Sequence, residues 1–77
     1  MNLSNVQKLS LSSNRIAVLE AYTFAGNSQM LRLELSNNSL ECLKNNTFAG
    51  LDSLKELLVD LNWIRSIEAN AFYGLPQ

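Results

Sequence analysis

The chain has 77 residues, enough for one small domain or part of a larger one. Its hydrophobic fraction of 47% is that of a globular chain rather than a disordered one. Six Lys and Arg residues against seven Asp and Glu residues give a formal net charge of −1. The chain therefore has no positive field that would attract nucleic acid or an anionic membrane surface. No apolar run approaches the roughly 20 residues needed to span a bilayer.

The residue inventory argues against catalysis and against a metal or cofactor. The chain has no histidine and one cysteine, Cys42, so a Cys–His pair, a Ser–His–Asp set, a zinc site and an internal disulfide are all excluded. Asp52 and Glu56 are close in sequence, but no apolar pocket is predicted around them, and we interpret them as surface residues. Cys42 itself is predicted to be a small, half-buried thiol. We expect no enzyme.

An internal repeat of 24 residues organises the chain. Residues 1–5 are interpreted as the tail of a preceding unit, and three units follow at 6–29, 30–53 and 54–77. A column of leucines, with Leu3, Leu51 and Leu75, has Asn27 as its one polar exception. The other columns are Val6, Met30, Leu54; Leu9, Leu33, Leu57; Leu11, Leu35, Val59; Asn14, Asn38, Asn62; Ile16, Leu40, Ile64; Leu19, Leu43, Ile67; Phe24, Phe48, Phe72; and Gly26, Gly50, Gly74.

Each unit begins with a short predicted strand. The segments "KLSLS", "RLELS" and "ELLVD", at 8–12, 32–36 and 56–60, alternate with period two, which predicts strands with one buried face. A single strand of this kind would leave its edges unpaired. Stacking the units pairs these edges into a parallel sheet with strands about 4.8 Å apart.

The rest of each unit is predicted to return behind the sheet as irregular turns, with at most short helical pieces. The glycine two residues after each phenylalanine suits a tight turn or a close approach between coils. An inward asparagine offers both a carbonyl and an amide group to the buried backbone of its own loop and of the next coil. We therefore predict an interior ladder of Asn14, Asn38 and Asn62.

The pattern resembles the leucine-rich repeat family, whose signature runs L-x-x-L-x-L-x-x-N-x-L. More closely, it resembles the 24-residue class that continues x-x-L-x-x-x-x-F-x-x-L-x-x and is common in animal extracellular proteins. The resemblance implies an α/β solenoid, a right-handed coil with a short parallel β-sheet on its concave face and mostly irregular loops on its convex face. Extracellular members often have cysteine-rich caps, and because none is visible we expect no capping domains and a fragment of a longer array.

Function in such a solenoid is expected on the outward positions of the strands, which line an extended concave surface. In the third unit, exposed aliphatic residues next to Trp63 have the composition of an interface core, although they could instead pack on a neighbouring repeat. Ser13 and Asn37 occupy the position of Leu61 in the earlier units. The predicted protein-binding residues are Lys8, Ser10, Ser12, Arg32, Glu34, Ser36, Glu56, Leu58, Asp60, Leu61 and Trp63.

Three sequons make N-glycosylation possible at Asn2, Asn37 and Asn45, in "NLS", "NNS" and "NNT". A glycan at Asn45 would lie on the outer coil, where we expect it to be harmless. A glycan at Asn37 would lie at the end of the predicted binding face and crowd a partner.

The resemblance implies a protein-recognition module of an extracellular or membrane-anchored protein, such as a receptor ectodomain, an adhesion protein or a matrix protein of the Toll-like or synaptic-adhesion kind. The expected partners are a protein ligand or co-receptor and neighbouring repeats of the same chain, with no nucleic acid and no membrane contact by this segment. Two alternatives remain: spacer repeats that hold curvature, or a cytosolic or bacterial scaffold of the same fold. The start "MNLSNVQKLS" lacks the features of a secretory signal, so the signal of a secreted parent would lie outside this chain.

Overall fold

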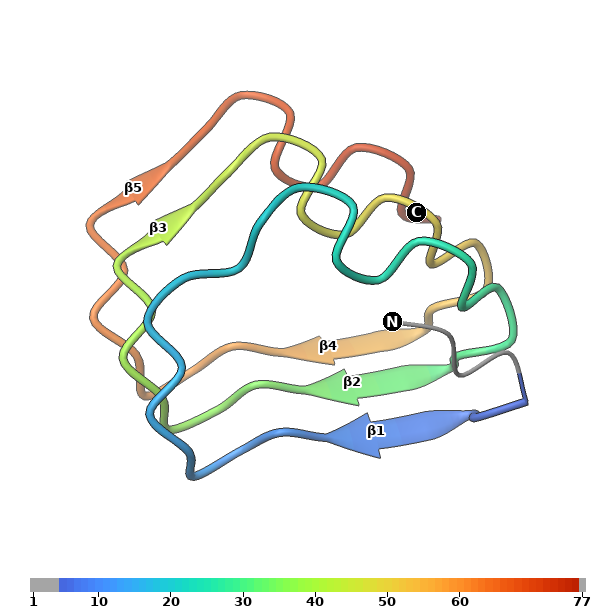
Figure 1. Cartoon of the computed structure of the whole chain (residues 1–77), viewed down its shortest axis with the longest axis horizontal. Helices are drawn as coiled ribbons and strands as arrows, with labels where there is room; N and C mark the ends of the chain where they lie inside the picture. The colour runs from blue at the N-terminus through green and yellow to red at the C-terminus, as the bar shows by residue number, and fades with distance from the viewer. Residues whose placement is uncertain (1–4, 77) are drawn as a thin grey trace.

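The computed structural model describes residues 5–76 as a coil in which segments 24 residues apart lie side by side (Figure 1). Strands β1, β2 and β4 form one parallel sheet in that order, and β3 pairs with β5 in a second parallel sheet. The strands are β1 (Lys8–Ser10), β2 (Arg32–Glu34), β3 (Cys42–Leu43), β4 (Glu56–Leu58) and β5 (Ser66–Ile67).

The register of the larger sheet follows the repeat. Leu9 lies opposite Leu33, and Leu33 lies opposite Leu57, so equivalent positions of neighbouring units pair directly. Because side chains alternate across a strand, this leucine column faces the interior and the residues on either side of it face outward. The predicted solenoid with its short parallel sheet is confirmed.

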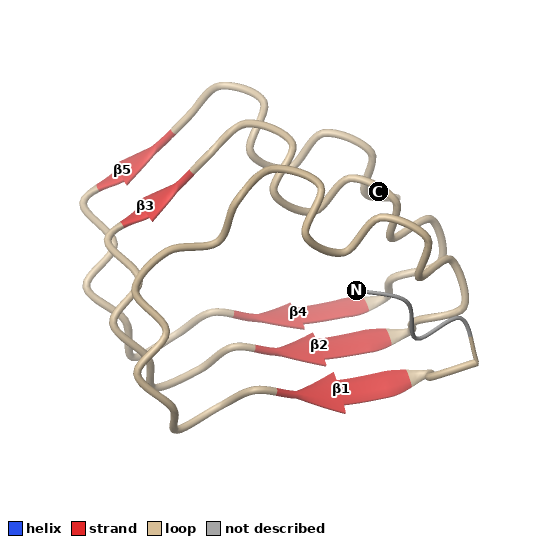
Figure 2. Cartoon of the chain, in the orientation of Figure 1, coloured by secondary structure: helices blue, strands red, loops and turns tan. Residues whose placement is uncertain are grey.

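The part of the coil opposite the larger sheet consists of turns and the β3–β5 pair, with no helix in residues 5–76 (Figure 2). The predicted irregular turns behind the first sheet are confirmed, whereas the sequence did not predict the second sheet. Single turns close by bonds such as that from the Ala25 N–H to the Tyr22 carbonyl, 3.1 Å. They do not extend into a helix because Tyr22 and Gly26 have φ values of 62° and 88°.

The core is complete around the middle coil. At equivalent positions on the flanking coils, Leu9 and Leu57 are only half-buried. In the third coil Ile67 is 54% exposed and Phe72 is 44% exposed. The columns therefore predict which side chains turn inward, whereas most side chains of the outer coils are less buried than their equivalents in the middle coil. Phe24 of the first coil is an exception, since it is fully buried. The fully buried apolar side chains of the middle coil are Met30, Leu33, Leu35, Leu40, Leu43, Phe48 and Leu51.

The phenylalanine column forms a continuous stack of rings. The centroids of Phe24 and Phe48 are 6.2 Å apart with an interplanar angle of 10°, and those of Phe48 and Phe72 are 5.9 Å apart at 6°. Ring pairs at such distances contribute about 0.5–1.5 kcal/mol each beyond their buried area. The stack fixes the spacing of the outer turns, as the sheet fixes the spacing of the strands.

Asn38 ties the first coil to the second. Its Oδ1 accepts a hydrogen bond from the Ile16 N–H at 3.1 Å, and its Nδ2 donates to the carbonyls of Leu11 and Leu35, both at 3.0 Å. Asn62 forms the same set of bonds one coil further along. The side chain thus satisfies backbone groups of two coils at once, and neither coil needs water for them.

Asn14 differs from the predicted interior ladder. Its side chain is exposed, and its Nδ2 donates to the Leu11 and Ser12 carbonyls within its own loop. The physical reason is its position, since residues 5–76 contain no earlier coil on that side for it to bridge.

We expect Asn38→Ala to lower the free energy of unfolding by about 3 kcal/mol, because it leaves several backbone groups without a partner at about 1–3 kcal/mol each. Asn14→Ala is the matched control, and it should cost less than about 1 kcal/mol because the loop remains open to water. Urea unfolding followed by circular dichroism measures both. Equal losses for the two variants would contradict the bridging role of Asn38.

Because the turns pack closely, replacing two equivalent glycines by alanine should lower the stability by different amounts. Both have positive φ, 88° at Gly26 and 99° at Gly50, but a β-carbon on Gly50 would lie 2.7 Å from the Ala25 Cα, and one on Gly26 would meet nothing within 4 Å. We expect Gly26→Ala to cost about 1 kcal/mol from backbone strain alone, and Gly50→Ala about 3 kcal/mol because the clash adds to it. Similar urea midpoints for the two variants would contradict this expectation, because they would show that the coils can move apart at Gly50 without a loss of stability.

Candidate functional site

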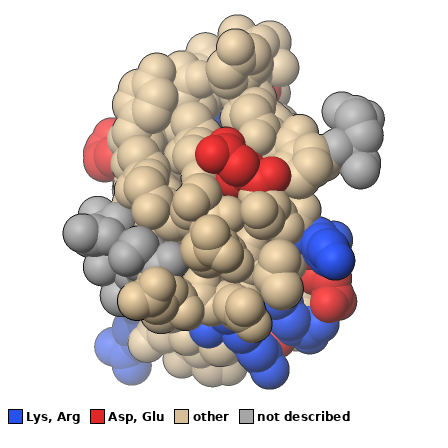
Figure 3. All heavy atoms as spheres, turned by 90° about the vertical axis from the view of Figure 1, so that its right-hand side faces the viewer, with Lys and Arg blue, Asp and Glu red and all other residues tan. Residues whose placement is uncertain are grey.

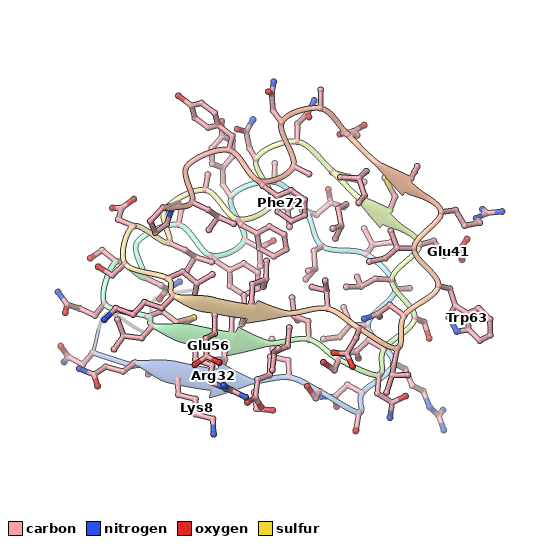
Figure 4. The ribbon with its side chains drawn as sticks, turned by 180° about the vertical axis from the view of Figure 1, so that it is seen from behind. Lys8, Arg32, Glu41, Glu56, Trp63 and Phe72 are labelled. Carbon is pink, nitrogen blue, oxygen red and sulfur yellow. The ribbon has the colours of Figure 1, made fainter. Side chains whose placement is uncertain are left out.

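The outward side chains of the larger sheet form one continuous surface, which we call the sheet face. The alternation of the strands places these side chains away from the leucine column, and the parallel register aligns them from coil to coil. Figure 4 shows Lys8, Arg32 and Glu56 in line across β1, β2 and β4. The sheet face consists of Lys8, Ser10, Arg32, Glu34, Glu56 and Leu58, continued by Ser12, Ser36 and Asp60 after the strands.

The charged residues of the sheet face pair with one another. Arg32 lies between two carboxylates, with its Nε 2.6 Å from the Glu34 Oε2 and its Nη1 2.5 Å from the Glu56 Oε2. Lys8 approaches Glu34 on the other side, with Nζ 3.9 Å from Oε2. Arg32 is therefore engaged by two carboxylates before any partner binds, whereas Lys8 remains 64% exposed and makes one long contact.

These ion pairs shift the pKa values of Glu34 and Arg32. Hydrogen bonds from Arg32 and then from Ser10 lower the pKa of Glu34, and the positive charges of Arg32 and Lys8 act in the same direction. In return, hydrogen bonds to Glu34 and Glu56 raise the pKa of Arg32. These interactions favour the charged forms of Arg32 and Glu34 at neutral pH. Seen from the side where the strands begin, mostly basic side chains lie near the sheet, with acidic atoms beside them at the lower right (Figure 3).

A row of polar contacts continues the same arrangement beyond the strands. The Ser36 hydroxyl donates to the Asp60 Oδ1, and the Ser36 N–H donates to the Ser12 Oγ at 3.1 Å. At the next position, the Asn37 Nδ2 donates to the Ser13 Oγ at 3.2 Å. Residues with the same place in successive units thus bind each other directly.

Apolar side chains occupy the end of this row in the third coil. Leu61 and Trp63 are each 72% exposed. The Trp63 side chain lies beyond the strand ends at the edge of the molecule, away from Arg32 (Figure 4). The backbone N–H of Trp63 donates a hydrogen bond to the Leu40 carbonyl at 3.0 Å. We call Ser13, Asn37, Leu61 and Trp63 the strand-end edge. The sequence pattern groups Trp63 with the strands, whereas the structure divides the candidate residues between two adjoining surfaces.

Leu58 also differs from the sequence-based expectation. The pattern predicts an exposed aliphatic residue, but Leu58 is half-buried, and it lies opposite Glu34 in the parallel sheet. Cys42 is half-buried as a free thiol, as expected. Asp52 is exposed, and the carboxylate of Glu56 faces Arg32.

The sequence reasoning missed an ion pair near Trp63. Arg65 and Glu41 lie with Nη2 2.9 Å from Oε1, and Lys44 and Glu20 form a longer pair at 3.6 Å. Each pair joins opposite charges 24 residues apart. The repeat interval that predicts the apolar columns could therefore also have predicted these ion pairs.

The two described sequons are accessible. Asn37 is exposed at the strand-end edge. Asn45 is exposed in the turns behind the sheet, where its Oδ1 accepts a hydrogen bond from the Asn70 N–H at 2.8 Å. The sequon at Asn2 lies outside the described residues.

Two kinds of site are missing from the described part of the chain. Between residues 5 and 76 no helix has the length and apolar character to cross a membrane. Over the same residues no three His, Cys, Asp or Glu side chains gather closely enough to hold a metal ion.

Comparison with known proteins agrees with the coil and its asparagine bridges. A family model described as leucine rich repeat matches residues 4–64. The chain belongs to the leucine-rich repeat family. Domains of this family are in general protein-interaction modules.

One solved structure is similar, a chain of the crystal structure of a TLR13-ssRNA13 complex, with a TM-score of 0.85 and 28% sequence identity. The match covers 88% of the present leucine-rich repeat chain and 10% of that chain, so the present chain spans a small part of the other's length. A search among curated proteins gave no match.

The lowered pKa of Glu34 predicts a dependence of stability on pH. Its usual value is 4.5, so the ionised carboxylate stabilises the folded state above about pH 4.5, and this contribution is lost as the pH falls through the lower folded value. We expect Glu34→Gln to lower the urea midpoint at about pH 7 and to match the unaltered chain at about pH 2.5.

Glu20→Gln is the control, because Glu20 is 76% exposed and its cation is 3.6 Å away. It should change the midpoint little at either pH. A Glu34→Gln deficit of the same size at both pH values would contradict the electrostatic role of Glu34.

Proposed function

We propose that this chain is a protein-recognition segment of an extracellular or membrane-anchored leucine-rich repeat protein of the receptor or adhesion type. The proposal rests on one observation: Leu61 and Trp63, each 72% exposed, border a sheet face whose cations lie beside carboxylates. Exposed tryptophan beside aliphatic side chains is typical of the centre of a protein interface. Fixed charges around such a centre favour one orientation of a partner over others.

A protein partner is favoured over single-stranded RNA, which is part of the complex in the similar TLR13 structure. Binding to a phosphate backbone needs Lys or Arg side chains that are free to neutralise the phosphates. On the sheet face Arg32 is held by Glu34 and Glu56, Lys8 lies 3.9 Å from Glu34, and the formal net charge of the chain is −1. These features oppose a phosphate backbone and do not oppose a protein surface.

An extracellular setting is supported by two exposed sequons, at Asn37 and Asn45, and by the likeness to a TLR13 chain. In this setting a glycan at Asn45 would lie behind the sheet, whereas one at Asn37 would border Leu61. The position of Asn37 makes its modification a means of limiting access to the strand-end edge.

To test the proposal, the chain is panned against a displayed collection of extracellular domains, and the binders are measured with variants. We expect Trp63→Ala combined with Leu58→Glu to weaken binding at least tenfold with an unchanged circular dichroism spectrum. Trp63→Ala removes the side chain at the centre of the interface, and Leu58→Glu adds a charge to the sheet face. Val18→Ala combined with Tyr22→Ala is the control, because these exposed residues lie in the segment that returns behind the sheet. A single-stranded RNA oligonucleotide serves as the counter-probe.

Three outcomes would contradict the proposal. Binders unaffected by the double substitution would indicate spacer repeats, and tight RNA binding at physiological salt would replace the protein partner. Expression behind a secretory signal without any glycan on Asn45 would favour the cytosolic scaffold.

A further inference from the structure

Leu61 occupies a backbone conformation that suits leucine poorly. Its φ is 57°, in the left-handed region, and the equivalent residues Ser13 and Asn37 have φ values of 62° and 57°. Asparagine tolerates this region, whereas the β-carbon and branched side chain of leucine crowd the backbone there. Leu61 is also 72% exposed, so no burial within residues 5–76 offsets the strain. The third unit thus holds a residue that lowers its own stability.

Strain alone does not single out Leu61. Tyr22 has a φ of 62° and is 59% exposed, at a position where the next unit has Asn46. Tyr22 lies in the turns behind the sheet, however, and its hydroxyl is compatible with exposure to water. Leu61 lies at the end of the sheet face, two residues from the exposed ring of Trp63. Only at Leu61 does strain coincide with a second exposed apolar side chain beside that face.

The surroundings of Leu61 are acidic. Of the sheet-face residues that the third unit contributes, Glu56 and Asp60 are acidic and none is basic. Arg65, two residues after Trp63, is already paired with Glu41. Glu56 shares Arg32 with Glu34, and the carboxylate of Asp60 accepts a hydrogen bond from a neutral hydroxyl. Over the whole sheet face, three carboxylates meet the two cations of Lys8 and Arg32. A partner that approaches Leu61 therefore meets an excess of negative charge.

We propose that Leu61 and Trp63 form an anchor for a protein segment that has an apolar side chain with a Lys or Arg beside it. The apolar side chain packs between Leu61 and Trp63, and the cation approaches Asp60 or Glu56. Burial of both exposed side chains on binding offsets the strain that leucine introduces in the free chain. This inference rests on the proposed function, because it specifies the partner of the same surface.

The experiment uses a phage-displayed library of random 12-residue peptides, panned on the chain. We expect the enriched peptides to combine an aromatic or aliphatic residue with Lys or Arg. Raising the salt concentration from about 50 to 300 mM should weaken their binding about fivefold, as expected for exposed charge pairs. Leu61→Asn should weaken binding at least tenfold and raise the urea midpoint, because asparagine removes the anchor and suits the left-handed backbone.

Two variants separate binding from backbone strain. Leu61→Ala should weaken binding without raising the midpoint, since alanine removes the anchor but keeps a β-carbon. Tyr22→Asn should raise the midpoint without changing binding, since it relieves similar strain at a distant place. Together with Leu61→Asn they show whether the leucine serves recognition rather than folding.

The outcomes distinguish this inference from the proposed function. Peptides whose binding is lost in Leu58→Glu but retained in Leu61→Asn would overturn the anchor and leave the sheet face as a binding surface. Enriched peptides without basic residues, or binding that does not respond to salt, would overturn the proposed partner chemistry. If no peptide binds in a way that depends on the sheet face or the strand-end edge, both proposals are wrong.

Discussion

Each inward loop of this solenoid has backbone groups that face a neighbouring coil rather than water, and their hydrogen bonds are the constraint on which the other features depend. Asn38 meets it between the first and second coils, and Asn62 between the second and third. By fixing the loop after each strand, these side chains set where each strand ends and where the chain turns into the left-handed region at Asn37 and Leu61. The sheet register, the ion pairs and the strand-end edge all follow from that loop.

The electrostatics of the sheet face follow from this register. Arg32 meets Glu56 because residues 24 apart are opposite each other in the parallel sheet, and Glu34 reaches the same guanidinium from its own strand. A surface with such internal pairs loses little side-chain freedom when a partner binds, because its long side chains are already ordered. The strand-end edge differs from the sheet face because its main side chains, Leu61 and Trp63, are apolar and exposed. They are therefore accessible to a partner.

The 24-residue interval was enough to predict the sheet, the inward columns and the bridging bonds of Asn38, because repeated units must bury the same positions. It could not predict the β3–β5 sheet, since segments as short as Cys42–Leu43 show no periodicity. It also could not predict that Asn14 is exposed, because equivalent residues differ only in their neighbours. The placement of Trp63 was uncertain for another reason, since the alternation that assigns a face to a side chain ends where the strand ends.

The pairing of equivalent residues restricts how the length of this chain can change. Arg32 with Glu56 and Asn37 with Ser13 are each 24 residues apart. Deleting a single residue from a strand would turn every following side chain of that strand to the opposite face and misalign both neighbouring coils. Deleting a whole unit would bring equivalent positions back into register, so that asparagine still meets its loop and phenylalanine its ring. Insertions and deletions in such a chain are therefore compatible with the fold in steps of one complete coil, or as loops that bulge away from the paired positions.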